Sequence, residues 1–259
     1  MDSQSNQAAL VSSVQSLGAA CYVQTLRQHP MVHDASLWSQ PPFDQFNLAL
    51  HVGDHPVSVQ ANRHCLLAQL QPYGLQRLVW LNQTHSTTVV RVDRALSFAS
   101  LNADALVTDQ RGVGLVIMTA DCLPIVLTDV VGCEVAVLHA GWRGLVDGVI
   151  EATVAAMRYP AQQAWLGAAI GATAFEVGDE VRTRFIAHDP TAAQAFIPQS
   201  NGQYLADLYA LARLRLVRLG INLITGGERC TLQEAAAFYS YRRDGVTGRM
   251  ATVAFLPVR

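Results

Sequence analysis

The sequence predicts a single α/β domain built on a mixed β-sheet that is flanked by helices. Its 259 residues are 51% hydrophobic and 15% charged, which is ample apolar content for a large buried core. Continuous apolar runs in the centre, such as residues 113–119, are typical of strands buried on both faces. Strands and helices mix without strict alternation, and no linker interrupts them. We therefore expect one domain over residues 22–259, preceded by an N-terminal extension over residues 1–21.

Turn residues, prolines and helix-capping signals define the N-terminal elements. In order, they predict a short helix over residues 8–17 ended by Gly18, a strand at 22–26, a proline-containing loop at 29–43, a strand at 46–52, and an amphipathic helix at 57–70 that begins after Asp54. This last helix rests on the apolar spacing of its residues.

The rest of the chain is predicted from short apolar runs bounded by turn residues, and from helical periodicity. Strands are expected at residues 77–81, 89–92, 105–108, 113–119, 125–128, 134–138, 165–170, 221–225 and 250–256. Helices are expected at residues 145–157, at 179–186, and at 208–219, where Asp207 provides the cap and Gly220 the end.

Composition excludes several classes of function. The formal net charge is −2, so no broad basic field favours nucleic acid or an anionic membrane surface. All 18 basic residues are arginine, which excludes Schiff-base chemistry and any catalytic lysine. A bound anion would therefore be held by arginine, by backbone amides or by a metal.

Cysteine usage and the N-terminus predict a cytoplasmic protein. The five cysteines are scattered without a C-x-x-C pair, which is typical of reduced thiols rather than a disulfide framework. No basic residue precedes Arg27, so the N-terminus does not resemble a signal peptide. No run of roughly 18 apolar residues is present, and we expect no membrane span.

Three reactive side chains follow apolar segments, at places where strand ends deliver side chains to pockets. They are His85, Cys122 and His139, separated by 37 and 17 positions. Two imidazoles and a thiolate with an open fourth position form a catalytic type of zinc shell, which can activate a water molecule. Alternatively, Cys122 is a small buried hydrophobic residue and the histidines are structural, because no short-range motif joins the three.

Arginines and further histidines extend the set of candidate site residues. Residues 141–144 precede a helix, where backbone amides and Arg143 could hold an anion, although a simple strand-to-helix turn is the alternative. A strand over residues 239–243 would point Arg242 and Arg243 to opposite faces. Arg63 could pair with Asp54 or reach a ligand. The remaining spaced histidines, His29, His33, His51 and His55, are interpreted as loop or capping residues.

The motifs taken together resemble the YfiH, or laccase-domain, family from about Tyr22 to the C-terminus. They are Phe46-Asn47-Leu48, His51-Val52-Gly53-Asp54, Asn62-Arg63, Gln83-Thr84-His85, Asp104-Ala105-Leu106-Val107-Thr108, Ala120-Asp121-Cys122-Leu123-Pro124, His139-Ala140-Gly141-Trp142-Arg143-Gly144 and Tyr239-Ser240-Tyr241-Arg242-Arg243-Asp244-Gly245. The resemblance implies a mixed α/β fold similar to the cysteine-hydrolase fold of cytotoxic necrotizing factor. It also implies a zinc site whose ligands, and catalytic residues, match His85, Cys122 and His139. Asn47, Arg63, Arg143 and Arg242 are the residues that we expect to bind substrate.

Three segments depart from the family pattern. Residues 27–40 replace an Arg-x-Gly-Gly-Val-Ser loop, residues 170–174 lack a cysteine that often follows Ile-Gly-Pro, and Ala212 stands where an Asn is common. None of these departures touches the three expected ligands, so they bear on substrate preference.

Four functions follow from these residues and the resemblance. The first is a zinc-dependent purine nucleoside enzyme that uses phosphate to cleave adenosine, inosine or methylthioadenosine and also deaminates adenosine, with Asp121 or Glu176 as proton carrier. The second is a metal-independent Cys-His hydrolase that edits peptidoglycan precursors, with Cys122 as nucleophile. A copper polyphenol oxidase is disfavoured, because only eight histidines occur and none forms a His-x-His pair. A nucleoside-binding module without turnover is the fourth.

Overall fold

The computed structural model describes residues 14–28, 37–93 and 101–258, and it confirms the α/β fold class. The expected sheet is divided into two large mixed sheets that pack face to face. The first has the order β1 (Gln15–Leu17), β2 (Ala20–Gln24), β14 (Met250–Phe255), β6 (Val113–Thr119) and β3 (Arg77–Val79). The second has the order β13 (Leu223–Gly226), β9 (Gln163–Leu166), β7 (Leu123–Thr128), β8 (Val135–Ala140), β5 (Ala105–Thr108) and β4 (Val89–Arg91).

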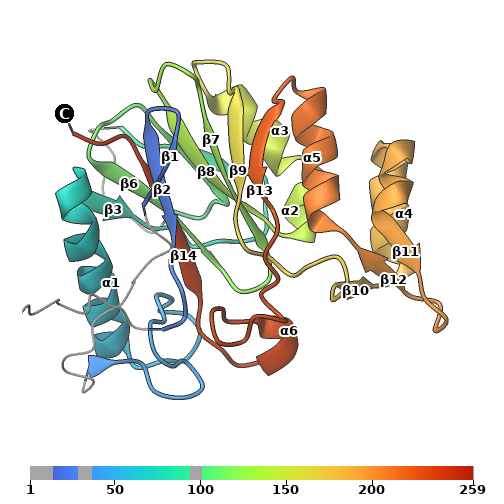
Figure 1. Ribbon diagram of the computed structural model, residues 1–259, viewed down its shortest axis with the longest axis horizontal. Helices are drawn as coiled ribbons and strands as arrows, with labels where there is room; N and C mark the ends of the chain where they lie inside the picture. Colours follow the sequence, from blue (N-terminus) through green and yellow to red (C-terminus); the bar gives the residue numbers. More distant parts are fainter. Residues whose placement is uncertain (1–13, 29–36, 94–100, 259) are drawn as a thin grey trace, which may run out of the picture.

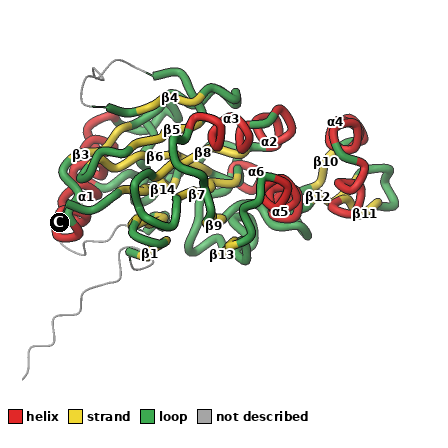
Figure 2. Tube along the Cα trace, turned by 90° about the horizontal axis from the view of Figure 1, so that it is seen from above, coloured by secondary structure: helices red, strands yellow, loops and turns green. Residues whose placement is uncertain are grey.

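Helices cover the outer faces of this sandwich, which gives four layers (Figure 1). Helix α1 (Pro56–Leu70) packs on the five-stranded sheet. Helices α2 (Trp142–Asp147), α3 (Val149–Ala156) and α5 (Leu208–Arg218) pack on the six-stranded sheet. A small sheet of β10 (Glu176–Val177), β12 (Tyr204–Ala206) and β11 (Phe196–Pro198) lies with α4 (Asp179–His188) at one end of the molecule (Figure 2).

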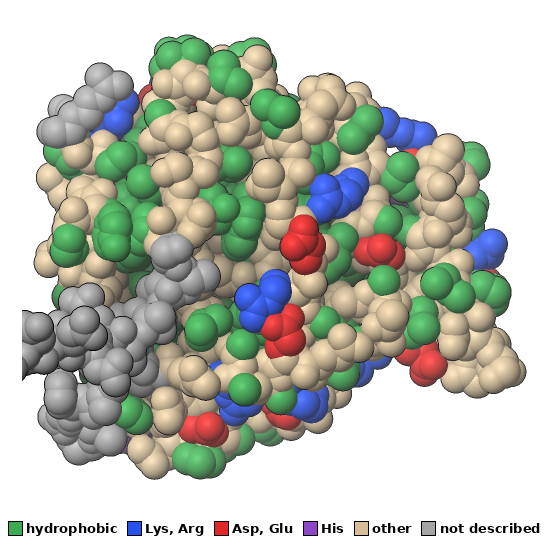
Figure 3. Space-filling model, in the orientation of Figure 1, with side chains coloured by type: hydrophobic (Ala, Val, Ile, Leu, Met, Phe, Trp, Pro, Cys, Tyr) green, Lys and Arg blue, Asp and Glu red, His purple; other side chains and the backbone are tan. Residues whose placement is uncertain are grey.

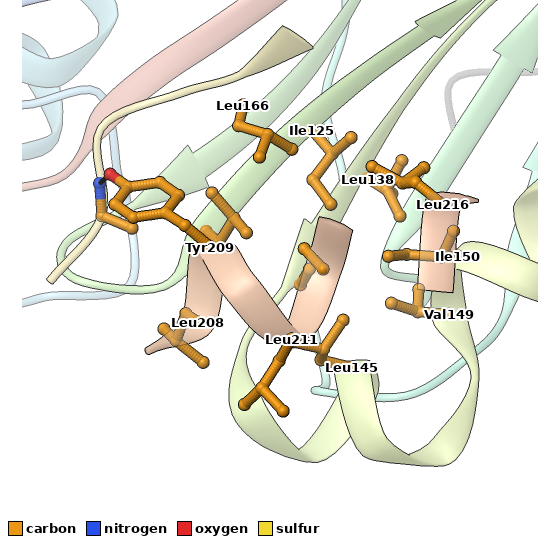
Figure 4. Packing of buried hydrophobic residues seen from close by; sticks show 14 of the residues in the cluster. Ile125, Leu138, Leu145, Val149, Ile150, Leu166, Leu208, Tyr209, Leu211 and Leu216 are labelled. Carbon is orange, nitrogen blue, oxygen red and sulfur yellow. Dashed lines mark hydrogen bonds between the residues drawn. The ribbon is translucent and has the colours of Figure 1, made fainter. Parts of the chain in front are cut away.

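The apolar strands alternate between two hydrophobic layers, as the two-residue period of a strand requires. Ile125 and Leu127 of β7 pack toward the helices, whereas Val126 packs between the two sheets. Leu138 of β8 meets α3 and α5 in the same helix-facing layer (Figure 4). The continuous apolar runs at the centre of the chain therefore correctly predicted strands that are buried on both faces.

The predicted helix over residues 8–17 is wrong at its C-terminal end, and its first part lies outside the described residues. Residues 15–17 form β1, which pairs with β2 through a tight turn at Gly18, whose φ is +58°. Gly18 is therefore a hairpin residue, because its positive φ suits the turn of a hairpin as well as the end of a helix. The described part of the expected N-terminal extension thus contributes a strand to the first sheet.

The predicted strand at residues 46–52 is also wrong, although Phe46, Leu48 and Ala49 are fully buried. The backbone of this segment bonds to side chains and, at Phe46 and Leu48, to single carbonyls of Arg27 and Arg249, instead of pairing along a neighbouring strand. The amide of Asn47 donates to the carbonyl of Ala49 and accepts from its N–H, and Arg63 donates to the carbonyl of Leu48. Buried backbone groups need partners, and polar side chains provide them here without a sheet.

Three further expectations about local structure are corrected by the structure. The expected helix 145–157 begins at Trp142 and is broken at Gly148, whose φ of +98° ends α2 and starts α3. Asp54 is not the cap of α1, because His55 holds that position and no side chain caps it. Residues 241–244 form a short helix, α6 (Tyr241–Asp244), instead of a strand, and Ser240 caps it by accepting from the N–H of Arg243.

The remaining helices and the surface agree with the sequence analysis. Asp207 caps α5 by accepting from the N–H of Ala210. Within the described residues, no helix is long and apolar enough to cross a membrane. On the face shown in Figure 3, basic and acidic side chains are interspersed rather than gathered into a field of one sign.

Candidate functional site

A cavity of about 530 Å³ opens beside the ends of β6 and β8 and the start of β7. Strands β6 and β7 belong to different sheets, so the residues between them cross from one sheet to the other. Its titratable and basic lining residues are His51, His85, Asp121, Cys122, His139, Arg143, Tyr241, Arg242 and Arg249. The strand ends therefore deliver reactive side chains to one space, as the sequence predicts.

The three expected ligands meet in this cavity. The ligand atoms of His85, Cys122 and His139 lie within 4.8 Å of one another. Cys122 Sγ is 4.0 Å from His85 Nε2, and the two imidazole rings lie edge to face with centroids 4.8 Å apart. A tetrahedral zinc ion, with bonds of about 2.0–2.3 Å, holds its ligands roughly 3.3–3.8 Å apart. Contraction by about 1 Å would suffice, so the donor set fits such an ion.

The pairing of β7 with β8 explains how Cys122 reaches His139. Leu123 lies opposite Ala140 in this antiparallel pair, so Cys122, one residue before β7, lies beside the end of β8. His139 is inside β8 rather than after it, which corrects the expectation that it follows the strand. Strand register, which links residues far apart in the chain, thus brings the two ligands together.

Backbone strain is concentrated at the site. Among the described residues, His85 (φ +59°) and Asp121 (φ +88°) are the non-glycine residues with positive φ. One is an expected ligand and the other directly precedes Cys122. Residues held in sparsely populated conformations cost about 1–3 kcal/mol and cluster at functional sites, so the strain supports a functional role for this region.

Gly141 provides the space in which the three side chains meet. A Cβ at this position would lie 3.0 Å from Cys122 Sγ and 3.1 Å from His85 Cδ2. The backbone of Gly141 has φ −62° and ψ 157°, which any residue can adopt. Glycine is required here by the close approach of the ligands and not by its own conformation.

Cys122 and His139 perturb each other's protonation. Burial alone would raise the pKa of the Cys122 thiol, but the charge and hydrogen bonds of His139 and His85 outweigh it and lower the pKa. Burial alone would lower the pKa of His139, but the Cys122 thiolate and Asp104 outweigh it and raise the pKa. Without a metal, the two side chains therefore favour a thiolate–imidazolium pair, and the thiolate is the form that binds a metal or attacks a carbonyl.

Asp104 is a site residue that the chemical reasoning missed, although it lies in one of the quoted motifs. Its carboxylate accepts from His139 Nδ1 at 2.8 Å and is fully buried. Burial would raise the pKa of this carboxyl, but hydrogen bonds from His139 and Ser86 hold it well below its usual range. The bond to Nδ1 leaves His139 Nε2 free for a ligand.

Two of the four residues expected to bind substrate line the cavity. The Arg143 guanidinium lies 4.5 Å from the ring centroid of Trp142. The Arg242 guanidinium lies 5.4 Å from the ring centroid of Phe175 and donates to the carbonyl of Glu176. Arg243 turns away and donates to the carbonyls of residues 231, 232 and 238, so one arginine of the pair faces the cavity, as expected.

The other two residues, Asn47 and Arg63, do not line the cavity. Asn47 is buried, and its side chain also accepts from the N–H of Arg249 and donates to the Asp54 carboxylate. Arg63 stacks at 3.8 Å on the ring of Trp80 instead of pairing with Asp54, and burial lowers its pKa to about 10. Both residues contact lining residues without lining the cavity themselves, Asn47 through Arg249 and Arg63 through Met118.

The cavity also contains His51 and Arg249, which sequence reasoning did not assign to it. His51 was interpreted as a loop residue, and His55 does take a capping position, at the N-terminus of α1. Burial and the charges of Arg249 and Arg63 lower the pKa of His51. Nothing in the local sequence marks Arg249, because it reaches the cavity through the loop before β14. His29 and His33 lie outside the described residues.

Of the two suggested proton carriers, Asp121 lines the cavity and Glu176 does not. Both carboxylate oxygens of Asp121 are engaged, one by the Thr231 hydroxyl at 2.6 Å and one by the N–H of Arg242 at 2.7 Å. Asp121 therefore holds α6 and its arginine against the segment that bears Cys122. The Glu176 carboxylate accepts from Asn201 and does not line the cavity.

Of the three segments that depart from the family pattern, residues 170–174 reach the cavity through Ile170.

Comparisons with known proteins agree with this architecture. Residues 31–257 match the family described as multi-copper polyphenol oxidoreductase laccase. A Pseudomonas aeruginosa protein named purine nucleoside phosphorylase is 47% identical over 84% of this chain and 88% of its own length. The Escherichia coli purine nucleoside phosphorylase YfiH is also 47% identical, over 84% of this chain and 89% of its own length.

Solved structures show the same likeness. A crystal structure of a Neisseria meningitidis protein from the DUF152 family has a TM-score of 0.88 and 42% identity, and covers 96% of this chain and 100% of its own. YlmD from Geobacillus stearothermophilus has a TM-score of 0.82 and 32% identity, and the match covers 93% of each chain.

Proposed function

Because this chain belongs to the YfiH, or laccase-domain, family, we propose that it is a purine nucleoside phosphorylase with a zinc ion bound by His85, Cys122 and His139. The observation that carries the proposal is the meeting of these three donors in a cavity whose arginines form no ion pair with a carboxylate of the described residues. Relatives that are 47% identical bear the name purine nucleoside phosphorylase, which supports an enzyme acting on a small molecule.

Unpaired arginines favour phosphate as the second substrate. Most arginines elsewhere in the described chain pair with carboxylates. Within the described residues, Arg143, Arg242 and Arg249 have no such partner, yet all three line the cavity. Arginine forks match the oxygens of phosphate, and the chain has no lysine that could replace them. We therefore assign phosphate binding to these three residues.

Aromatic side chains favour a purine as the other ligand. Trp142, Phe175 and Tyr241 line the same cavity as the arginines. Purine rings stack on aromatic faces with a gain of about 1–3 kcal/mol per base. The arginines lie against these same rings, so a nucleoside whose base contacts the rings would hold its ribose near the arginines, where bound phosphate could approach the anomeric carbon.

The donor set limits which metals can be expected. One thiolate and two imidazoles suit zinc, but they also suit a single copper ion. A multicopper oxidase needs several copper sites, whereas the described residues contain this one group of three donors. When bound, zinc would supply Lewis acidity beside the substrate. The proposal includes deamination of adenosine at the same site.

The decisive experiment combines metal and product analysis. Protein purified without added metal is expected to contain about one zinc ion per chain. It should convert adenosine, inosine or methylthioadenosine to the free base only when phosphate is present. Cys122→Ala and His139→Ala should lose both the zinc and the turnover. Full turnover of adenosine by a metal-free His139→Ala protein would contradict the proposal. Stoichiometric copper in the purified protein would contradict zinc as the bound metal and assign copper to the site.

A second candidate function is a metal-independent hydrolase, and a specific contact favours it. Cys122, His139 and Asp104 form a chain from thiol to imidazole to buried carboxylate, in the order of a nucleophile, a base and an orienting acid. Such an enzyme would cleave an amide of a peptidoglycan precursor. Activity that survives a strong chelator but is lost on thiol alkylation would favour this function over the phosphorylase.

We also infer a cytoplasmic location. All five cysteines are free thiols, which suits a reducing compartment, and purine nucleosides and phosphate are small metabolites of that compartment.

A further inference from the structure

One buried carboxylate joins the segments that carry the two histidines. Oδ1 of Asp104 accepts from His139 Nδ1 at 2.8 Å and from the backbone N–H of His85 at 3.0 Å. Oδ2 accepts from the backbone N–H and the hydroxyl of Ser86, at 2.6 and 2.8 Å. It also accepts from the N–H and the hydroxyl of Thr84, at 3.1 and 3.2 Å. The side chain therefore contacts both the His85 loop and the His139 ring.

The backbone of Asp104 is itself fixed. Its N–H donates to the carbonyl of Thr88, and its carbonyl accepts from the N–H of His139 at 2.7 Å. Strand β5 begins at the next residue, where Ala105 lies opposite Leu138 of β8. Asp104 thus occupies a rigid point at the end of a paired strand, from which its carboxylate reaches both segments.

We propose that Asp104 is the positioning residue of the metal centre and sets the orientation of both histidine ligands. This inference rests on the metal site proposed above. The carboxylate holds Nδ1–H of His139, so that Nε2 faces the other donors. By accepting from three successive backbone N–H groups it also stabilises the strained loop that presents His85, whose φ is +59°.

The expected size of the effect follows from metal sites in general. Loss of a carboxylate that orients a ligand histidine typically weakens metal affinity by roughly 10- to 100-fold. Asp104→Asn would replace one acceptor oxygen by an amide that donates, in a place where every neighbour is a donor. We expect its zinc affinity to fall at least within this range, because two ligands lose their orientation together.

The chain offers a matched control in Asp129. This carboxylate is also buried, at 3% exposure, and accepts from the backbone N–H groups of Gly132, Cys133 and Glu134. It lies in the turn between β7 and β8 and does not line the cavity, and the groups that donate to it are backbone N–H groups rather than an imidazole. Asp129→Asn should therefore reproduce the structural loss without the loss of metal affinity.

The test measures zinc affinity of the wild type, Asp104→Asn and Asp129→Asn by competition with a chromophoric chelator. Denaturant unfolding in the absence of zinc compares the stability of the three proteins. A ¹⁵N-histidine NMR spectrum provides a readout that needs no metal: the wild type should show a protected, downfield Nδ1–H of His139. We expect Asp104→Asn to lose both this signal and the zinc affinity, and Asp129→Asn to keep both.

Each outcome bears on the inference. Unchanged zinc affinity or an unchanged Nδ1–H signal in Asp104→Asn would overturn it, and equal loss of affinity in both variants would show a merely structural role. If Asp104→Asn does not fold, Asp104→Glu, which keeps the charge but moves it by one methylene, should still bind zinc more weakly. A wild type that binds no metal but shows the protected Nδ1–H would contradict the metal site alone, leaving Asp104 as the group that orients His139. A wild type without the signal would contradict Asp104's role.

Discussion

Gly141 shows how one missing side chain can determine a site. The position is the N-cap of α2, with an extended backbone that alanine also adopts, yet a Cβ there would lie 3.0 Å from Cys122 Sγ. We therefore expect Gly141→Ala to fold with little loss of stability and to bind zinc much more weakly than the wild type. Zinc titration and thermal unfolding of the variant check this.

The control for this variant is Gly178→Ala. Gly178 is the N-cap of α4 and also has an extended backbone, but the atoms nearest to a Cβ there belong to the flexible side chain of Glu180. Its zinc affinity should equal that of the wild type. Equal affinity in Gly141→Ala would show that the three donors do not share one ion.

Cys122 should differ from the other cysteines in its reaction with alkylating agents. The charge of His139 lowers its thiol pKa against the effect of burial, whereas burial raises the pKa of Cys21 and of Cys65. Since only the thiolate reacts, the alkylation rate of Cys122 in metal-free protein should level off below the ordinary thiol pKa of about 8.5. Peptide mapping after iodoacetamide treatment across pH measures each cysteine separately.

Replacing His139, the cationic neighbour of Cys122, should remove the lowering of the Cys122 thiol pKa. In His139→Gln the thiol of Cys122 loses its cationic neighbour, so its pKa should rise and the alkylation profile should shift to higher pH. An unshifted profile in this variant, or a wild-type profile that coincides with that of Cys65, would contradict the thiolate–imidazolium pair.

At the scale of elements, the cap of α5 is a local signal that the structure confirms. Asp207 accepts from the N–H of Ala210 at 2.9 Å and lies outside the proposed metal cavity. Loss of an N-cap costs about 0.5–2 kcal/mol, so Asp207→Ala should lower the free energy of unfolding by about 1 kcal/mol. Asp207→Asn keeps the acceptor oxygen and should retain most of the stability. Denaturant unfolding measures the stability of both variants. An equal loss of unfolding free energy in Asp207→Ala and Asp207→Asn would argue that the Asp207 side chain does not act as a cap.

Other elements could not be predicted from local signals, because tertiary contacts determine them. Residues 46–49 have the apolar pattern of a strand, but the Asn47 and Arg63 side chains and two isolated backbone bonds replace the hydrogen bonds of a neighbouring strand. Gly18 has the same sequence signature at the end of a helix and in a hairpin. Pairing of β1 with β2 selects the hairpin. Local patterns specify burial and turns, but not the partner that satisfies the backbone.

At the scale of the whole molecule, metal binding should stabilise the fold. The three donors come from a loop, from the crossing between the two sheets and from a strand, so the unfolded chain does not hold them together. A ligand that binds only the folded state stabilises it by about 2.7 kcal/mol at a hundred times its Kd. The unfolding midpoint of the wild type should therefore rise with free zinc. Cys122→Ala should show no rise, and an equal rise in both proteins would place the bound zinc elsewhere.

The amino-acid sequence was enough to predict the fold class, the strands buried on both faces, the helix over residues 57–70 and the three side chains with the right chemistry. Those features depend on composition and short-range periodicity, which a chain carries wherever it folds. The folded chain was needed to show that two sheets form, that Asp104 joins both histidines, and that Arg249 rather than Arg63 faces the cavity. These features depend on strand register and on contacts between distant segments, and no local pattern of residues specifies such contacts.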